Sequence, residues 1–220
     1  MCSLRLMHRS VSLQGHSPGV IYLDRLYNVL IAGVGGQGNL LCGRVLAEAA
    51  ILKGYRPTIG ETFGASRRGG TVVTHVRIGD HDLGPLIPRG TVDMLIGLEP
   101  MEALRAAVDY CGERAIAVVS TAEVQTMQCI TGTTKYPPLA DILDVMSSIC
   151  ASVSPIDPVL ALGETEYRRV LNSFMLGAAL TIGIAPLTAN GVRESLTGLM
   201  QPVGPNVAAF DAGLKTSVRV

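Results

Sequence analysis

The sequence predicts an α/β protein with a Rossmann-like, doubly wound, mostly parallel sheet and a helical C-terminal third. Short apolar runs of strand length alternate with segments of helical periodicity. Several of these runs are apolar throughout, as strands are when helices cover both faces of a parallel sheet. A glycine-rich turn joins the first run to the first helical segment, which is typical of a phosphate-binding crossover.

The first unit begins with residues 27–38, YNVLIAGVGGQG. A buried strand is predicted over the apolar run 29–32 and is followed at once by the glycine turn. The helix that follows spans residues 37–53, where apolar side chains recur at helical spacing, and Gly54 is placed to end it.

The middle of the chain continues the alternation of strands and helices. The expected strands are residues 57–61, 71–78, 93–99, 115–120 and 149–153, and the expected helices are residues 101–110 and 139–148. Pro100 suits the first turn of a helix, because proline there loses no intrahelical hydrogen bond. A polar loop, TFGASRRGG, connects the second and third strands.

The last third of the sequence is predicted to be helical. Helices are expected at residues 168–184, 188–200 and 206–214, and two of these segments are rich in small and apolar residues. Such helices can pack onto the sheet or form a face that binds a partner, and the sequence alone favours neither.

Composition limits the classes of function. The 220 residues suit an N-terminal extension at 1–26, expected to be loosely ordered, and one domain at 27–220. Charged residues make up only 16%, against a usual quarter, so we expect a partner to cover part of the surface. Zero formal net charge argues against nucleic acid as a partner. The longest apolar runs are too short for a membrane span, so a cytoplasmic protein is expected.

The cysteines do not form a cofactor motif. There are five, an odd number, and no pair has C-x-x-C spacing. This argues against a disulfide framework and against a zinc or iron–sulfur site built by this chain alone. Cys42, inside the first helix, is interpreted as a packing residue. No metal site and no catalytic residues are predicted.

The glycine turn is the first candidate binding site. Gly33, Gly35 and Gly38 fit G-x-G-x-x-G, and Gly36 and Gln37 complete the loop. Glycine lets the backbone approach a ligand closely, and the helix N-terminus favours an anion. The ligand could be a nicotinamide dinucleotide or another anion, or the loop could be only a tight turn.

Three further candidates are charged. A dinucleotide site needs an acid at the end of the second strand, and Glu61 occupies that position. Arg67 and Arg68, followed by Gly69, could clamp a carboxylate or a pyrophosphate, or could form a solvated turn paired with Glu61. Glu99 ends a buried strand on the ligand side of the sheet, but it could equally be an acid at a helix start.

Six ordered blocks of sequence carry a family resemblance. They are residues 33–38 (GVGGQG), 61–70 (ETFGASRRGG), 74–78 (THVRI), 97–105 (GLEPMEALR), 172–179 (NSFMLGAA) and 208–213 (AAFDAG). Together they resemble the gamma-type subunit or domain of 2-oxoacid:ferredoxin oxidoreductases. Within that family the pattern is most similar to subunit beta of the indolepyruvate enzymes, because the E-x-x-G-x-x-x-R-G-G block resembles the arylpyruvate type.

The resemblance implies an accessory subunit. A 2-oxoacid is decarboxylated on thiamine diphosphate, electrons pass through iron–sulfur clusters to ferredoxin, and coenzyme A takes the acyl group. Thiamine and the clusters are carried by an alpha-type partner, so the isolated chain is expected to be inactive. Arg67 and Arg68 would bind coenzyme A phosphates or a carboxylate, and Glu61 and Glu99 would orient them. The alternatives are a stand-alone NAD(P)-dependent reductase and a non-enzymatic docking module.

Overall fold

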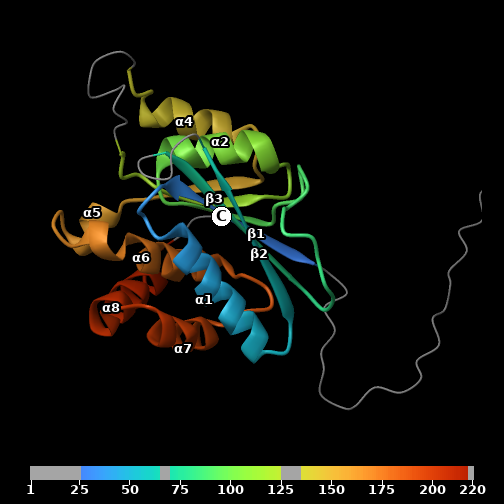
Figure 1. The fold of residues 1–220 in the computed structure, drawn as a ribbon. Coiled ribbons are helices and arrows are strands. Elements are labelled where there is room, and N and C mark those ends of the chain that lie inside the picture. Colours follow the sequence, from blue (N-terminus) through green and yellow to red (C-terminus); the bar gives the residue numbers. More distant parts are fainter. Residues whose placement is uncertain (1–25, 65–69, 125–134, 218–220) are drawn as a thin grey trace, which may run out of the picture.

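Six strands form one sheet with helices on both of its faces (Figure 1). The structure, a computed structural model, describes residues 26–64, 70–124 and 135–217. Across the sheet the order is β2-β3-β1-β4-β5-β6. The strands are β1 (Tyr27–Val34), β2 (Arg56–Phe63), β3 (Thr71–Gly79), β4 (Met94–Gly97), β5 (Ile116–Ser120) and β6 (Ser152–Ile156). The predicted α/β class is confirmed.

The sheet is mostly parallel but not wholly so. Strands β1, β4, β5 and β6 pair in parallel, whereas β3 is antiparallel to both β1 and β2. The hairpin β2–β3 therefore inserts a reversed strand between the first strand and the second. The two outer strands each contain a proline, Pro57 in β2 and Pro155 in β6, as expected where no further strand needs the missing N–H group.

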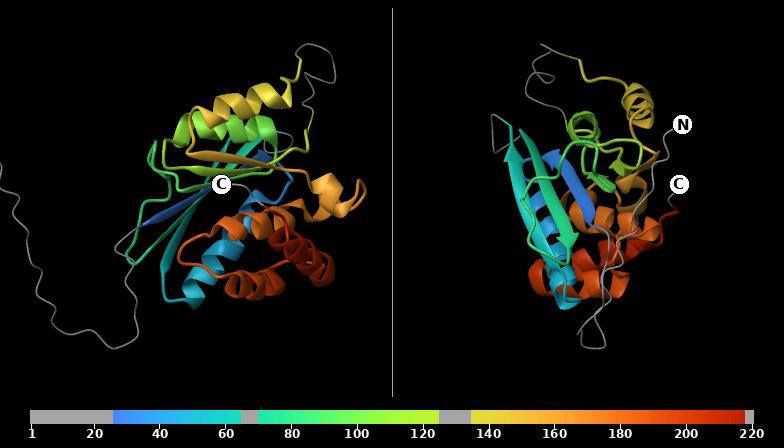
Figure 2. Two further views of the ribbon diagram at one scale, coloured as in Figure 1. Left: turned by 180° about the vertical axis from the view of Figure 1, so that it is seen from behind. Right: turned by 90° about the vertical axis from the view of Figure 1, so that its right-hand side faces the viewer.

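The helices form two layers. They are α1 (Asn39–Leu52), α2 (Pro100–Tyr110), α4 (Leu139–Ser147), α5 (Pro158–Leu162), α6 (Tyr167–Ile182), α7 (Ala189–Leu199) and α8 (Val203–Leu214). Helices α2 and α4 cover one face of the sheet, and α1, α6, α7 and α8 lie on the other (Figures 1 and 2). The sheet is thus doubly wound. Among the C-terminal helices, α6 packs on β4 and β5, α8 packs on α6, and α7 packs on α1. The alternative of a face that binds a partner stays a prediction.

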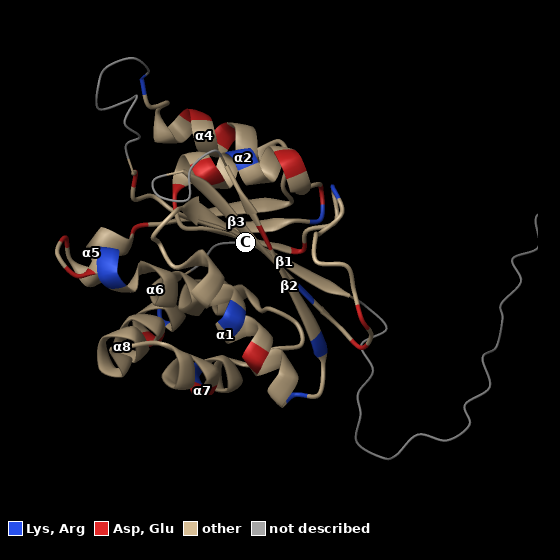
Figure 3. Cartoon of the chain, viewed as in Figure 1, with Lys and Arg blue, Asp and Glu red and all other residues tan. Residues whose placement is uncertain are grey.

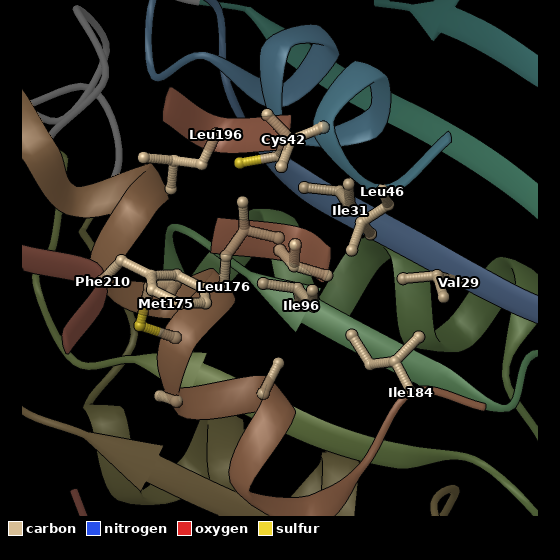
Figure 4. Close-up of a cluster of buried hydrophobic side chains, with 14 of the residues drawn as sticks. Val29, Ile31, Cys42, Leu46, Ile96, Met175, Leu176, Ile184, Leu196 and Phe210 are labelled. Carbon is tan, nitrogen blue, oxygen red and sulfur yellow. The ribbon is translucent and has the colours of Figure 1, made fainter. Parts of the chain in front are cut away.

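Side-chain alternation along β1 builds both halves of the core. Val29 and Ile31 point into the larger cluster, beneath α1 and α6, while Leu30 and Ala32 point into the smaller one, beneath α2 and α4. Cys42 is fully buried in the larger cluster (Figure 4), which agrees with its interpretation as a packing residue. Fully burying one large apolar side chain of this core, such as Leu30 or Ile31, stabilises the folded state by about 1.5–3 kcal/mol.

Most predicted elements lie within a few residues of those observed. The last strand is shifted to β6 from the predicted 149–153, and the short α5 was not predicted; Asp157 caps α5 through its side chain. The predicted extension at 1–26 falls almost wholly outside the described residues and stays a prediction.

None of the described helices is long and apolar enough to cross a membrane. Acidic and basic residues are interspersed in both helical layers (Figure 3).

Helices α6 and α8 pack at backbone distance. Gly177 faces the backbone of α8, and a Cβ there would overlap the carbonyl oxygen of Phe210. Gly213 faces back, and a Cβ there would overlap the carbonyl oxygen of Phe174. Two glycines therefore allow α6 to lie against α8 while Phe174 and Phe210 remain fully buried.

We expect Gly177→Ala to destabilise the protein by about 3 kcal/mol, the upper end for overpacking, because neither helix backbone can yield to one methyl group. Gly198→Ala is the matched control: Gly198 lies in α7 with open space around it, so alanine should stabilise by about 0.5–1 kcal/mol. Urea unfolding of both variants measures the difference. Equal effects would show that the α6–α8 contact tolerates side chains.

Candidate functional site

The glycine turn lies where the sheet changes direction. The connection after β1 leads to α1 on one face, and the connection after β4 leads to α2 on the other. Because β1 and β4 are neighbouring parallel strands, their carboxyl ends form the crevice in which open α/β sheets bind ligands. The candidate site is therefore built around residues 33–38 and Leu98–Glu99.

Gln37 joins the two connections across this crevice. Its Oε1 accepts a hydrogen bond from Val34 N at 2.7 Å, and its Nε2 donates to Leu98 O at 3.1 Å. A Cβ on Gly33 would lie 2.5 Å from Gln37 Oε1, so the first glycine leaves room for this side chain. The Gln37 amide thus fills the inside of the turn and fixes the distance between the two strand ends.

Gly38 is placed by a different contact. It is the N-cap of α1 in the left-handed conformation, with φ of 84°, and no side chain caps the helix. A Cβ there would lie 2.5 Å from Nδ2 of Asn172, which belongs to α6. Asn172 is only 8% exposed, and within the described part of the chain its amide nitrogen has no acceptor. The uncapped helix N-terminus and a spare amide donor therefore meet at one point.

The acid at the end of the second strand is not next to β1. Glu61 lies on β2 and pairs with Thr74 of β3, so a whole strand separates it from the glycine turn. In a dinucleotide-binding crossover the second strand lies beside the first. Glu61 is thus displaced by one strand from the position that a ribose contact requires.

The double-arginine connection ends beside the turn. Arg67, Arg68 and Gly69 lie outside the described residues, so their predicted roles stay predictions. The residue that follows them, Gly70, accepts a hydrogen bond from Gly35 N at 2.9 Å. This bond attaches the end of the β2–β3 connection to the glycine turn and takes up one of the amides of the turn.

A cavity of about 600 Å³ opens beside the turn. It is lined by Gln37, Ala122, Glu123, Val124, Tyr167, Arg168 and Leu171. Arg168 is exposed, and its Nε donates to Tyr167 Oη at 3.1 Å while its guanidinium lies 5.6 Å from the centre of the tyrosine ring. Among the described residues no carboxylate lies within ion-pair distance of Arg168. Among the described lining residues, Arg168 is thus a cation available for an anionic ligand, and Glu123 is an acid of the same lining.

Glu99 caps α2 from inside the protein. It is 1% exposed and accepts hydrogen bonds from Glu102 N (2.8 Å), Val124 N (3.3 Å) and Tyr136 Oη (2.5 Å). Burial raises the pKa of its carboxyl, and the hydrogen bonds from Tyr136, Glu102 and Val124 offset part of that rise. The geometry agrees with the alternative of an acid at a helix start, and a binding role for Glu99 at the crevice stays a prediction.

Sequence reasoning missed several residues of the site. Asn172, Arg168 and Tyr136 come from segments far from the turn, and nothing in their spacing connects them to it. Asn172 opens the block NSFMLGAA, a signal of family membership that carried no indication of a role. In the described part of the chain, no group of three or more His, Cys, Asp or Glu residues could hold a metal ion.

Fold and site together define an α/β protein of the Rossmann type with a ligand crevice at the switch point of its sheet. Residues 28–216 match the family described as pyruvate ferredoxin/flavodoxin oxidoreductase, and the chain belongs to this family. The match covers all but the two ends of the chain. The predicted resemblance to 2-oxoacid:ferredoxin oxidoreductase subunits is confirmed.

Several relatives are oxidoreductase subunits by name. Indolepyruvate oxidoreductase subunit IorB of Archaeoglobus fulgidus is 38% identical over 87% of this chain and 95% of its own length. The IorB of Pyrococcus horikoshii is 31% identical over 87% of this chain and 96% of its own. The gamma subunit of the NADH-dependent phenylglyoxylate dehydrogenase of Aromatoleum evansii is 27% identical over 74% and 78%.

Solved structures share the fold. The gamma subunit of a keto/oxoacid ferredoxin oxidoreductase from Geobacter sulfurreducens superposes with a TM-score of 0.57 at 22% identity, covering 86% of this chain and 96% of that one. The 2-oxoglutarate:ferredoxin oxidoreductase of Magnetococcus marinus gives 0.65 at 21% identity, over 87% of this chain and 31% of that longer one.

We expect Gly38→Ala to destabilise the protein more than Gly54→Ala. Both glycines have nearly the same φ, 84° and 83°, so left-handed strain of about 1–2 kcal/mol applies to both variants. Only Gly38 has a neighbour, the Asn172 amide, because nothing lies within 4 Å of a Cβ at Gly54. Guanidinium unfolding of the two variants isolates this contact, and an equal loss would contradict it.

Proposed function

We propose that the chain is the accessory subunit of a 2-oxoacid:ferredoxin oxidoreductase of the arylpyruvate type. The supporting observation is that four relatives named indolepyruvate oxidoreductase subunit IorB are 28–38% identical over 85–87% of the chain. The complex would oxidatively decarboxylate indolepyruvate or another arylpyruvate to the acyl-CoA and pass electrons to ferredoxin. We assign thiamine diphosphate and the iron–sulfur clusters to an alpha-type partner subunit in the cytoplasm.

The chain itself would contribute a binding surface for an anionic group, and the phosphates of coenzyme A suit it chemically. The uncapped N-terminus of α1 and the spare amide of Asn172 are donors, and Arg168 adds a cation at the adjoining cavity. In this proposal Arg67 and Arg68 join the same group of donors, because Gly70 holds the end of their connection beside the turn.

Two observations favour this role over an NAD(P)-dependent reductase. Insertion of β3 moves Glu61 away from the position of a ribose contact. Gly35 N donates to Gly70 O instead of remaining available for a pyrophosphate, and the Gln37 amide fills the turn. Fluorescence titration of the purified chain with NADH tests the alternative, and saturable tight binding would support it.

We expect the chain, co-expressed with its thiamine-bearing partner, to form an active complex. Indolepyruvate should exceed pyruvate in kcat/KM by about tenfold or more, which is within the discrimination that an apolar pocket gives. Assays of ferredoxin reduction over a series of 2-oxoacids measure this. Pyruvate as the best substrate would overturn the arylpyruvate assignment while leaving the subunit role intact.

We expect Arg168→Ala to raise the KM for coenzyme A in that complex about fivefold, as for a solvent-screened charge pair. The KM for the 2-oxoacid should not change. Arg169→Ala is the matched control, since Arg169 is an exposed arginine of the same helix that does not line the cavity. Equal responses of the two variants would show that Arg168 does not face the ligand.

A further inference from the structure

The buried carboxylate of Glu99 does more than cap a helix. An N-cap requires one acceptor for the first turn, and Glu102 N already donates to Oε2. The other oxygen, Oε1, accepts from Val124 N and from Tyr136 Oη. Val124 follows β5 and Tyr136 precedes α4, so one carboxylate joins both flanks of the β5–α4 connection to α2.

One of these flanks is a wall of the cavity. Ala122, Glu123 and Val124 line it, opposite Gln37 and the start of α6. The near end of the wall is held by Ser120 Oγ, which accepts from Ala122 N at 3.1 Å. In the described part of the chain, the far end is held by Glu99 through Val124 N. Loss of that acceptor would leave the wall attached at one end only.

Tyr136 strengthens the same attachment. Its hydroxyl donates to Glu99 and accepts from Met101 N at 3.2 Å, so it connects the approach to α4 with the first turn of α2. The approach to α4 and the end of the cavity wall thus donate to the same oxygen of Glu99, Oε1.

The charged groups around Glu99 come from three elements. Helix α2 supplies Glu102, which is 3% exposed and whose Oε1 pairs with Arg105 at 2.6 Å. The connection after β5 supplies Glu123, and the approach to α4 supplies Tyr136, whose pKa is raised by burial and by Glu99. Arg105 pairs with Glu102, and among the described residues no cation lies within ion-pair distance of Glu99, so its carboxylate is stabilised by its three hydrogen bonds.

We propose that Glu99 is a positioning residue of the crevice, whose carboxylate fixes the wall 122–124 against α2 and thereby sets the shape of the cavity. The identity of the ligand rests on the proposed function, but the attachment of the wall does not. Protonation of the carboxyl removes acceptor capacity, because the oxygen that carries the proton becomes a donor. At least one of the three hydrogen bonds is then weakened.

Hydrogen exchange of the Val124 amide tests the attachment without any ligand. In the full chain, Glu99→Gln should speed exchange of this amide about tenfold, as expected for loss of one buried, charge-assisted hydrogen bond. Tyr136→Phe, which keeps the carboxylate, should give a smaller increase and is informative if Glu99→Gln does not fold. Thr188→Ala is the control, because Thr188 caps α7 through its hydroxyl and touches neither flank.

The pH dependence has two opposite signs. Burial raises the folded-state pKa of Glu99 above its ordinary 4.5, so ionisation of this carboxyl costs stability. The contribution of Glu99 to the free energy of unfolding therefore falls as the pH rises from 4.5 through the raised pKa. The wall should behave oppositely: exchange at Val124, corrected for intrinsic rates, should slow as the carboxylate forms. Glu99→Gln should lack both dependences. An unchanged Val124 exchange in Glu99→Gln and Tyr136→Phe would overturn the proposal.

Kinetics of the assembled complex give the second readout. Glu99→Gln should raise the KM for coenzyme A more than it lowers kcat, and Glu99→Asp, which retains the charge, should restore part of the affinity. If exchange at Val124 responds but no KM does, the wall is positioned as inferred and the proposed ligand is wrong. If kcat falls while the KM for coenzyme A, the KM for the 2-oxoacid and the exchange rate of the Val124 amide all stay unchanged, Glu99 does not act through the wall.

Discussion

The structure depends on the close approach of α6 to its neighbours. This helix is buried along much of its length and meets α8 through Gly177 and Gly213, and the N-terminus of α1 through Asn172 and Gly38. Close packing of this kind leaves no room for a methyl group at any of the three glycines. The same placement puts the Asn172 amide beside the glycine turn and Arg168 at the cavity, so the packing of the core and the geometry of the crevice have one cause.

The crevice is held by side-chain amide and carboxylate groups rather than by the glycines alone. Gln37 joins the ends of β1 and β4, and Glu99 joins α2 to both flanks of the β5–α4 connection. Both side chains accept hydrogen bonds from backbone N–H groups where regular structure ends or begins: Gln37 from Val34 at the end of β1, and Glu99 from Glu102 in the first turn of α2 and from Val124 after β5. Gly33 provides space for Gln37 and Gly38 provides space for Asn172, which gives the glycines a packing role although the neighbouring acid that a dinucleotide requires is absent.

Local patterns predicted nearly all of the elements, because apolar periodicity and the positions of Gly and Pro determine where strands and helices begin and end. Insertion of β3 between β1 and β2 was not predictable, since pairing partners are chosen by packing over long sequence separations. Glu99 and Gln37 were identified as site residues, but their hydrogen bonds depend on Leu98, Val124 and Tyr136, which come together only in the folded chain. The family could be recognised because its blocks are short, ordered and distinctive.

The prolines of the outer strands limit how the sheet can associate with other chains. Pro57 in β2 and Pro155 in β6 have no N–H group, so each outer strand has one backbone donor fewer, and proline on an edge strand opposes pairing with another chain. Arg56 and Glu61 add charge along the β2 edge. Continuation of the sheet into a strand of another chain is therefore disfavoured at both edges, and we expect any partner to bind mainly through side chains and connecting loops.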